Sequence, residues 1–213
     1  AERTRGEIAA ATGNDAIGIV IADLASQASI REAAQVLIER CPQVHLLLNN
    51  AGITNLSREV TPDGIEATFA VNHLAYFLLT NLLLGPLRAT SGARIVNVAS
   101  DAHKFGGPLD LEDVGLQKGF GWTRAYGRSK GANILFTHEL GRRLEGSGVV
   151  AHALHPGFVR SNLGANNGRL GKIITRIAAV FATPAETAAR HVVAVCQEPR
   201  FGDSTGGYFY KAK

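Results

Sequence analysis

Four short apolar segments alternate with helical patterns along this chain, and their order constrains the fold more than any other feature. The apolar segments span residues 17–22, 44–48, 94–99 and 149–154. Segments of this length and near-continuous apolar character are typical of strands that are buried on both faces of a parallel sheet. Because strands and helices alternate, the sequence predicts an α/β fold with a doubly wound parallel sheet in a single domain.

Helical patterns fill the intervals between the apolar segments. Helices are expected at 1–11, 29–40, 61–84, 122–144 and 183–197, and a last strand is expected at 206–210. The second helix is expected to open with a capping box from Ser29 to Glu32 and to stop before Pro42. Residues 168–182 have an amphipathic pattern that fits either a lid over the protein's own pocket or a helix lying on a membrane.

Composition excludes several classes of function. The 213 residues are 46% hydrophobic, which suits a domain with a sizeable core. The net charge of +4 is spread along the chain, with no basic run longer than Arg142-Arg143, which argues against a nucleic-acid surface. Polar residues interrupt the longest apolar stretch, 69–84, so no membrane span is expected.

The cysteines and histidines predict no metal centre. Cys41 and Cys196 lie far apart and fit no metal or redox spacing, which favours a reduced, cytoplasmic setting. The nearest pair of histidines, His152 and His155, falls on an expected strand, where a spacing of three residues points the side chains to opposite faces. We therefore expect no metal site.

The expected helix at 122–144 carries a tyrosine and a lysine on one face. Tyr126 and Lys130 are four residues apart, so their side chains lie about one turn apart. A phenol has an ordinary pKa of about 10, and a neighbouring ammonium favours the phenolate. Tyr126 could therefore act as a general acid or base, although the pair by itself also fits an ordinary pair of surface side chains.

Other motifs accompany this pair in a fixed order. Asn49-Asn50-Ala51-Gly52 follows the second apolar segment, Ser100 ends the third, and Pro156-Gly157 follows the fourth, while Asn72 lies within an expected helix. This set resembles the short-chain dehydrogenase/reductase family. Three stretches of the sequence are most similar to its retinol-dehydrogenase-like branch, namely VNHLAYFLLTNLL, RIVNVASDAH and ALHPGFVRSNLG. The resemblance implies a Rossmann-type fold that binds NAD or NADP.

The resemblance also implies roles for particular residues. The catalytic residues would be Asn72, Ser100, Tyr126 and Lys130, with Asn72 at a helical bulge where its main chain anchors a water that links to the lysine. The cofactor-binding residues would be Asp23, Leu24, Asn49, Ala51, Gly52, Tyr126, Lys130, Pro156, Gly157, Val159 and Ser161. From the residues alone, Asp23 fits equally well as a cap of the next element, and Asn72 as a hydrogen-bonded core amide.

Two positions depart from the family's pattern. The family often has two serines where this chain has Ala99-Ser100, so that only Ser100 can act, and it commonly has threonine at the position of Ser161. Serine keeps the hydroxyl that would meet the nicotinamide amide. The resemblance also favours the lid for residues 168–182, because family members have a substrate-binding segment there.

The implied activity is NAD(P)-dependent interconversion of an alcohol and a carbonyl compound. Phe105, Trp122, Phe158 and the segment 170–181 indicate a medium or large apolar substrate. By analogy, a homodimer or homotetramer is expected, paired through the helix that begins near Gly64 and the helix that carries Tyr126.

The family's first strand, glycine-rich turn and second strand have no counterpart in the sequence. The sheet is therefore expected to be incomplete at its N-terminal side, with the segment 17–22 orphaned and the segment 44–48 at an exposed edge. The choice between NAD and NADP depends on residues after that second strand, so it stays open.

Three other functions compete with this interpretation. The first is a truncated, non-catalytic nucleotide-binding or interaction protein on the same scaffold. The second is a sugar-nucleotide epimerase of the extended branch, which is disfavoured because no room for a substrate domain follows the last strand. The third is a Ser129-Lys130 hydrolase dyad, which is disfavoured because adjacent helical residues do not face each other.

Overall fold

A computed structural model describes residues 1–159, 163–164, 167–168 and 182–213. Its centre is a parallel sheet in the order β1-β2-β3-β4. The strands are β1 (Leu46–Asn49), β2 (Arg94–Val98), β3 (Val150–His155) and β4 (Tyr208–Tyr210). The predicted parallel α/β fold is confirmed, and four predicted strands appear with bounds that differ by one or two residues.

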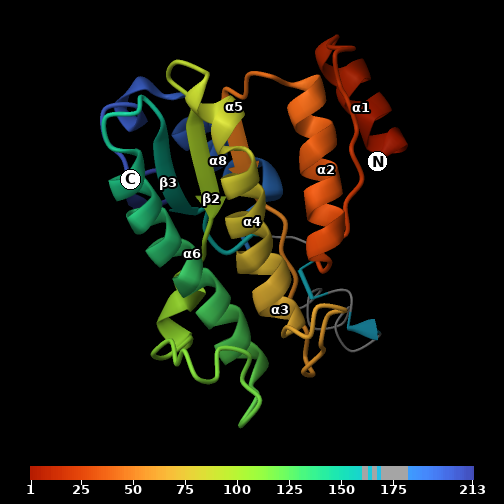
Figure 1. Ribbon diagram of the computed structural model, residues 1–213, viewed down its shortest axis with the longest axis vertical. Coiled ribbons are helices and arrows are strands. Elements are labelled where there is room, and N and C mark those ends of the chain that lie inside the picture. Colours follow the sequence, from red (N-terminus) through yellow and green to blue (C-terminus); the bar gives the residue numbers. More distant parts are fainter. Residues whose placement is uncertain (160–162, 165–166, 169–181) are drawn as a thin grey trace.

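Helices cover both faces of the sheet (Figure 1). One face packs against α4 (Ala75–Leu82), α5 (Leu84–Arg88) and α6 (Trp122–Leu144), and the other packs against α8 (Ala185–Gln197). The remaining helical elements are α1 (Glu2–Thr12), α2 (Gln27–Arg40), α3 (Ala67–Phe69), the π-helical turn η1 (Ala70–Leu74), and the 3₁₀ turns η2 (Asp101–Phe105) and η3 (Pro199–Phe201). The helix predicted at 122–144 matches α6 at both ends.

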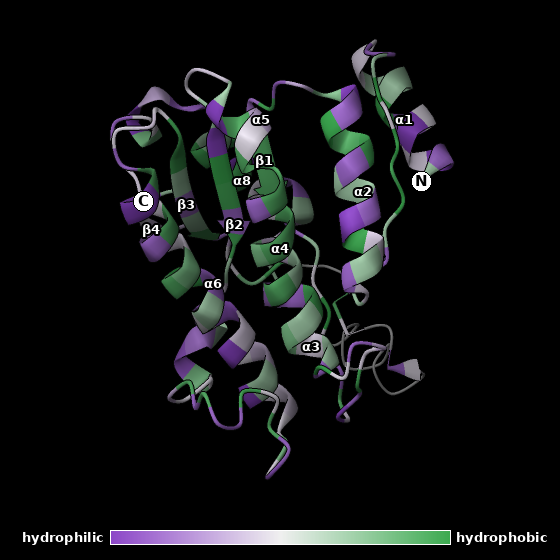
Figure 2. Cartoon of the chain, in the orientation of Figure 1, coloured by the Kyte–Doolittle hydropathy of each residue, from purple (hydrophilic) through white to green (hydrophobic). Residues whose placement is uncertain are grey.

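The apolar core divides into two clusters because successive strand residues point to opposite faces. Ile95 packs with Leu87 and Leu144 on the α4–α6 side, whereas Val96 packs with Leu154 and Val195 on the α8 side. Figure 2 shows the apolar residues concentrated on the strands and on α4, whereas α1 and α2 carry many polar residues. This pattern is that of a sheet buried on both faces.

The prediction of a strand at 17–22 is wrong. The segment is extended, but it forms no ladder with any strand in the described part of the chain, and Ile21 is 76% exposed. A strand requires a hydrogen-bonded neighbour, and none lies beside this segment. β1 is accordingly an edge strand, and its residues Leu46 and Leu48 are each 40% exposed. The expected orphan segment and exposed edge are thus confirmed.

Two predicted helix starts are also wrong. α2 begins at Gln27, because Ser26 is its N-cap and the Ser26 hydroxyl accepts the Ser29 N–H at 3.3 Å. Ser29 does not form the predicted capping box, because its hydroxyl accepts the Asp23 N–H. The helix expected from residue 61 begins at Ala67, because the Glu66 carboxylate caps it by accepting backbone N–H groups. Nearly all of the expected amphipathic helix at 168–182 lies outside the described residues.

Candidate active site

The carboxyl ends of β1 and β2 face the first half of α6, and several of the predicted site residues gather there. The Lys130 ammonium donates a hydrogen bond to the carbonyl of Val98, the last residue of β2, at 2.9 Å. Ser100, two residues further along, shares a side-chain hydrogen bond with Tyr126. The predicted juxtaposition of a strand-end hydroxyl, a phenol and an amine is therefore present.

Lys130 is 3% exposed, yet no carboxylate lies within salt-bridge distance of it among the described residues. Two aromatic rings flank its Nζ atom, with centroid distances of 5.5 Å to Tyr76 and 5.7 Å to Tyr126. Burial disfavours the charged form and lowers the pKa of Lys130 to about 7.

Burial raises the pKa of Tyr126, and the hydrogen bond with Ser100 opposes that change only in part. The expectation that Lys130 lowers the pKa of this phenol is not met. The physical reason is that burial destabilises the charged phenolate by more free energy than the neighbouring groups provide in stabilising it. Ser100 itself caps η2, because its hydroxyl oxygen accepts the Ala102 N–H at 3.2 Å.

Asn72 lies in the π-helical turn η1, so the helical bulge that the resemblance implied is confirmed. Its side-chain amide exchanges two hydrogen bonds with the backbone of Ile53, at 2.8 and 2.9 Å, and donates a third to the Ser129 hydroxyl at 3.1 Å. The backbone carbonyl of Asn72 accepts a hydrogen bond from the side-chain Nδ2 atom of Asn133 at 2.8 Å. Asn72 is thus a fully hydrogen-bonded core amide, and its part in a water relay stays a prediction.

The turn after β1 lies against the same cluster. A Cβ atom on Gly52 would be 3.7 Å from the Lys130 Nζ atom and 3.4 Å from the Asn72 Oδ1 atom, so glycine keeps the backbone close to both. The carbonyl of Ala51 accepts a hydrogen bond from the Tyr76 hydroxyl at 2.8 Å. Ala51 and Gly52 therefore lie beside Lys130 and Tyr76.

Asn49 points into the protein. Its Nδ2 atom donates to the Asn97 Oδ1 atom at 2.8 Å and to the Thr80 hydroxyl at 3.0 Å. These bonds fasten β1 to β2 and to α4. Asn49 thus fixes the strand from which the Ala51–Gly52 turn starts.

The turn after β3 is held by residues from the end of the chain. The Pro156 carbonyl lies 3.1 Å from the Nδ1 atom of His191 on α8. Gly157 has a φ angle of 105°, which favours glycine, and a Cβ there would lie 3.1 Å from Cε of Lys211. Val159 forms a parallel bridge with Thr183. Ser161 lies outside the described residues.

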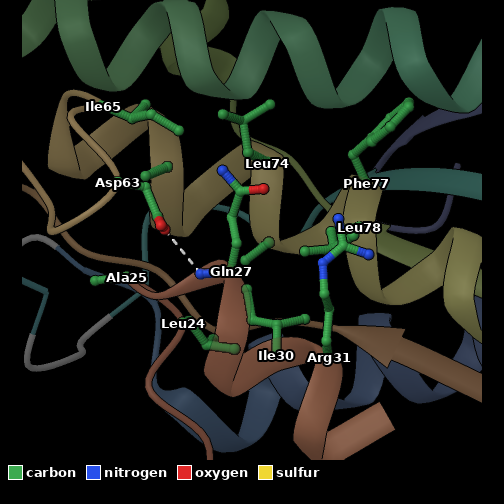
Figure 3. A pocket seen from close by; sticks show the side chains of 12 residues that line it. Leu24, Ala25, Gln27, Ile30, Arg31, Asp63, Ile65, Leu74, Phe77 and Leu78 are labelled. Atoms are coloured by element: carbon green, nitrogen blue, oxygen red, sulfur yellow. Dashed lines mark hydrogen bonds between the residues drawn. The ribbon is translucent and has the colours of Figure 1, made fainter. Parts of the chain in front are cut away.

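Asp23 and Leu24 lie at the start of α2. The Asp23 carboxylate accepts the Ala25 N–H at 2.9 Å, which closes a turn before the helix, whereas the N-cap of α2 is Ser26, so Asp23 is not the cap of this helix. Leu24 lines a mainly apolar cavity of about 250 Å³ between α2 and α4. Figure 3 shows Ile30 and Arg31 of α2 facing Phe77 and Leu78 of α4 across this cavity.

Sequence reasoning missed two residues of this site, Tyr76 and Asn133. Tyr76 follows Asn72 by four residues, and Asn133 follows Lys130 by three. Both spacings put a residue on the same helix face as its predicted partner. Helical spacing from the motif residues was therefore the signal that could have found them.

The described residues contain no group of three histidine, cysteine, aspartate or glutamate side chains that could hold a metal ion. Within the same residues, no helix combines the length and the apolar character that crossing a membrane requires.

Comparisons with known proteins agree with this geometry. A family model described as short chain dehydrogenase matches residues 1–169. Retinol dehydrogenase 14 of Mus musculus is 42% identical over 195 residues, which cover 90% of this chain and 58% of that protein. Retinol dehydrogenase 13 of Homo sapiens is 42% identical over 193 residues, covering 88% of this chain and 58% of that protein. The chain thus spans less than two thirds of the length of these curated relatives.

Solved structures share the fold. A Mycobacterium paratuberculosis protein is 32% identical, with a TM-score of 0.71 over 96% of this chain and 66% of its own. A short chain dehydrogenase from Burkholderia cenocepacia J2315, solved in complex with NADP, is 26% identical, with a TM-score of 0.71 over 99% of this chain and 81% of its own. The expected Rossmann-type architecture is confirmed.

Proposed function

The chain belongs to the short chain dehydrogenase family, and from this premise we propose that it acts as an NAD- or NADP-dependent oxidoreductase that interconverts an alcohol and a carbonyl compound. One observation carries the proposal. A buried lysine that makes no ion pair within the described residues, a phenol and a serine hydroxyl converge at the carboxyl ends of two parallel strands, which is the edge where open α/β sheets bind nucleotides.

Each of these side chains has a proposed role. The Ser100 hydroxyl holds the substrate oxygen by a hydrogen bond. Tyr126 gives that oxygen a proton in reduction and takes a proton from it in oxidation. Because burial raises its pKa, the Tyr126 phenol keeps its proton at neutral pH, and this state favours reduction of a carbonyl. Asn72 holds the turn beside Lys130, and we propose that its main chain keeps a water relay to that lysine.

The residues present fit the nicotinamide and ribose half of the cofactor. Lys130 makes one hydrogen bond among the described residues, so its remaining N–H groups are available to ribose hydroxyls. Gly52 keeps the backbone after β1 close to Lys130, and Gly157 keeps the backbone after β3 close to Lys211. The remaining proposed contacts of the dinucleotide are Asp23, Leu24, Asn49, Ala51, Pro156, Val159 and Ser161. When bound, the cofactor supplies or accepts the hydride, and the protein supplies placement and proton transfer.

We propose a medium or large apolar alcohol, aldehyde or ketone as the substrate. Phe105, Trp122 and Phe158 are exposed apolar side chains on the segments that follow β2 and β3. The named relatives are retinol dehydrogenases, and retinol is an apolar alcohol. Both observations support a substrate that is recognised mainly by its apolar body.

The test is a pair of tyrosine variants. Tyr126→Phe removes the proton donor and keeps the ring, so turnover of an apolar aldehyde should fall at least a hundredfold. Affinity for NADPH or NADH, measured by quenching of Trp122 fluorescence, should change little. Tyr210→Phe, at an exposed tyrosine of β4, is the matched control and should keep both properties. Near-normal turnover of Tyr126→Phe contradicts the proposal.

The open edge of β1 favours a second candidate, a non-catalytic nucleotide-binding or interaction protein. This edge exposes Leu46 and Leu48, and no described strand pairs with it. The same titration separates the candidates. Quenching without turnover in the unsubstituted chain supports nucleotide binding alone, and the absence of both supports an interaction protein.

A further inference from the structure

The buried ammonium of Lys130 raises the question of what stabilises it. Moving a charge out of water is costly unless it is paired and hydrogen-bonded. Lys130 donates one hydrogen bond of 2.9 Å to the Val98 carbonyl and has no ion pair among the described residues. One neutral hydrogen bond compensates only part of the lost hydration, so other groups must contribute.

Tyr76 supplies the first of these contributions. Its ring centroid lies 5.5 Å from the Lys130 Nζ atom, slightly closer than the ring of Tyr126 at 5.7 Å. Tyr76 is 2% exposed and comes from α4, whereas Tyr126 comes from α6. An ammonium within about 6 Å of an aromatic centroid is attracted to the ring, more strongly where water is excluded.

The hydroxyl of Tyr76 supplies a second contact. It donates to the Ala51 carbonyl at 2.8 Å. Gly52, the next residue, lies against both Lys130 and Asn72. One side chain therefore joins the lysine to the turn after β1.

We propose that Tyr76 is a positioning residue of the oxidoreductase site, whose ring holds the Lys130 ammonium and whose hydroxyl holds the Ala51–Gly52 turn against it. This inference deepens the proposed function and rests on it. Tyr76 does not compete with Tyr126 for proton transfer. A carbonyl can only accept a hydrogen bond, so the Tyr76 hydroxyl must keep its proton to make the bond to Ala51.

The groups that titrate around Lys130 are few in the described part of the chain. They are Tyr126 on its own helix, Tyr76 on α4 and His73 on the π-helical turn. Burial is the main cause that lowers the pKa of His73, and the charge of Lys130 contributes to it. Burial also raises the pKa of Tyr76. Near neutral pH, a substitution that removes the Tyr76 ring is therefore expected to change the charge of Lys130 and not that of the other groups.

Three variants separate the ring from the hydroxyl. Tyr76→Phe keeps the ring and removes the bond to Ala51. Tyr76→Leu removes both, and Tyr76→Met removes both with a side chain of similar volume but different shape, which tests whether the result depends on how the vacated space is filled. Phe77→Leu, the next residue on α4, is the control, since Phe77 is an exposed apolar side chain.

The primary readout is the pKa of Lys130, measured by NMR of the ¹⁵N-labelled lysine side chain in the full chain. Loss of the ring should lower this pKa by about 0.5 to 1 unit in the Leu and Met variants. In Tyr76→Phe and in Phe77→Leu the pKa should stay within about 0.3 unit of the parent, because the ring at position 76 is retained.

Kinetics supply the second readout. Tyr76→Phe should raise KM for the cofactor about fivefold and leave kcat nearly unchanged, because one hydrogen bond to the turn is lost. The Leu and Met variants should also move the lysine-dependent limb of the pH profile to lower pH. A merely structural role would lower kcat without moving that limb.

Two results overturn the proposal. The first is a Lys130 pKa that is unchanged in folded Tyr76→Leu and Tyr76→Met. The second is a pKa that falls as far in Tyr76→Phe as in those two variants, since the hydroxyl rather than the ring would then hold the charge. Failure of the proposed function appears elsewhere, as full turnover in Tyr126→Phe or as no turnover in the parent, and it leaves the NMR comparison readable.

Discussion

At the scale of the residue, the site is governed by the burial of groups that prefer water. Lys130 has a pKa of about 7 in the folded chain, far below its ordinary value of 10.5. Between these values the unfolded chain binds one proton more than the folded chain. The free energy of unfolding therefore rises with pH across this window, by up to about 1.4 kcal/mol per pH unit from this group. Below pH 7 the cost of burying the charge is fully present.

Lys130→Met should remove this dependence, because methionine fills a similar volume without a charge. Between about pH 7 and pH 9, urea denaturation should show the parent gaining about 2 kcal/mol relative to the variant. At pH 7 the variant should be the more stable of the two. Lys104→Met, at an exposed lysine that pairs with Asp101, is the control and should run parallel to the parent. Equal pH dependence in the parent and in Lys130→Met contradicts the assigned pKa.

At the scale of the element, glycines set how closely α6 approaches η2, the turn that Ser100 caps. A Cβ on Gly127 would lie 2.5 Å from the Ala102 carbonyl oxygen and 2.6 Å from the Gly106 nitrogen, which are backbone atoms that cannot move aside alone. Gly131, one turn further along α6, has open space by comparison, with its nearest neighbour 3.9 Å away. The packing that holds Ser100 beside Tyr126 thus requires glycine at one position and not at the other.

Gly127→Ala should lower the free energy of unfolding by roughly 1–3 kcal/mol, because η2 must move away from α6. Gly131→Ala should be neutral, or should stabilise the chain by up to about 1 kcal/mol, because alanine favours a helix. Guanidinium denaturation of both variants measures the difference. Equal stabilities of the two variants would show that the contact between α6 and η2 is loose.

The π-helical turn is held from α6 by Asn133. The backbone carbonyl of Asn72 can only accept a hydrogen bond, so the Nδ2 atom of Asn133 must face it. The Oδ1 atom of Asn133 therefore faces Nδ1 of His73, at 2.9 Å. Nδ1 must then carry the proton of the neutral imidazole. The hydrogen-bond network thus assigns the tautomer of His73.

Asn133→Asp should break this arrangement, since a carboxylate has no donor for the Asn72 carbonyl. We expect a loss of about 1–3 kcal/mol of stability and a raised pKa of His73, because a negative charge favours the imidazolium. Long-range ¹H–¹⁵N NMR of the parent should report the Nδ1–H tautomer. Asn81→Asp, at an exposed asparagine of α4, should change neither property. An Nε2–H tautomer in the parent refutes the assignment.

At the scale of the whole molecule, the sheet of the described residues ends in two edge strands, β1 and β4. Helices pack on both of its faces, but Leu46 and Leu48 of β1 stay 40% exposed, and the outer edge of β1 carries no neighbour in the described residues. An exposed apolar edge strand is a template for pairing with another chain. α4 and α6 also expose Phe77 and Leu135, and these side chains support our proposal of a homodimer or homotetramer.

A lysine at the edge should suppress association through β1. Leu48→Lys places the charge at an exposed position, so light scattering should report less aggregation with little change in stability. Leu47→Lys, one residue earlier, buries the charge in the core cluster and should prevent folding. Unchanged aggregation of folded Leu48→Lys would mean that the chain associates through another surface.

The sequence by itself determined the elements whose signal is local. Three of the four apolar runs became parallel strands, the last strand was expected at 206–210, and the span of α6 followed from its pattern alone, because period and composition act within a few residues. The order of the motifs identified the family, and thereby the meeting of Ser100, Tyr126 and Lys130. Roles in binding and catalysis remain predictions for all of the site residues that the motifs indicated.

Only the tertiary structure decided the rest, since those features depend on partners distant along the chain. The segment 17–22 has the composition of a strand and forms none, because a ladder needs a neighbour. Tyr126 has a lysine one turn away and still has a raised pKa, because burial outweighs that charge. Tyr76 and Asn133 reach Lys130 and Asn72 across an interface between helices. Local pattern indicates which elements can form, contact across the fold decides which of them do form, and hydration together with those contacts decides what their side chains can do.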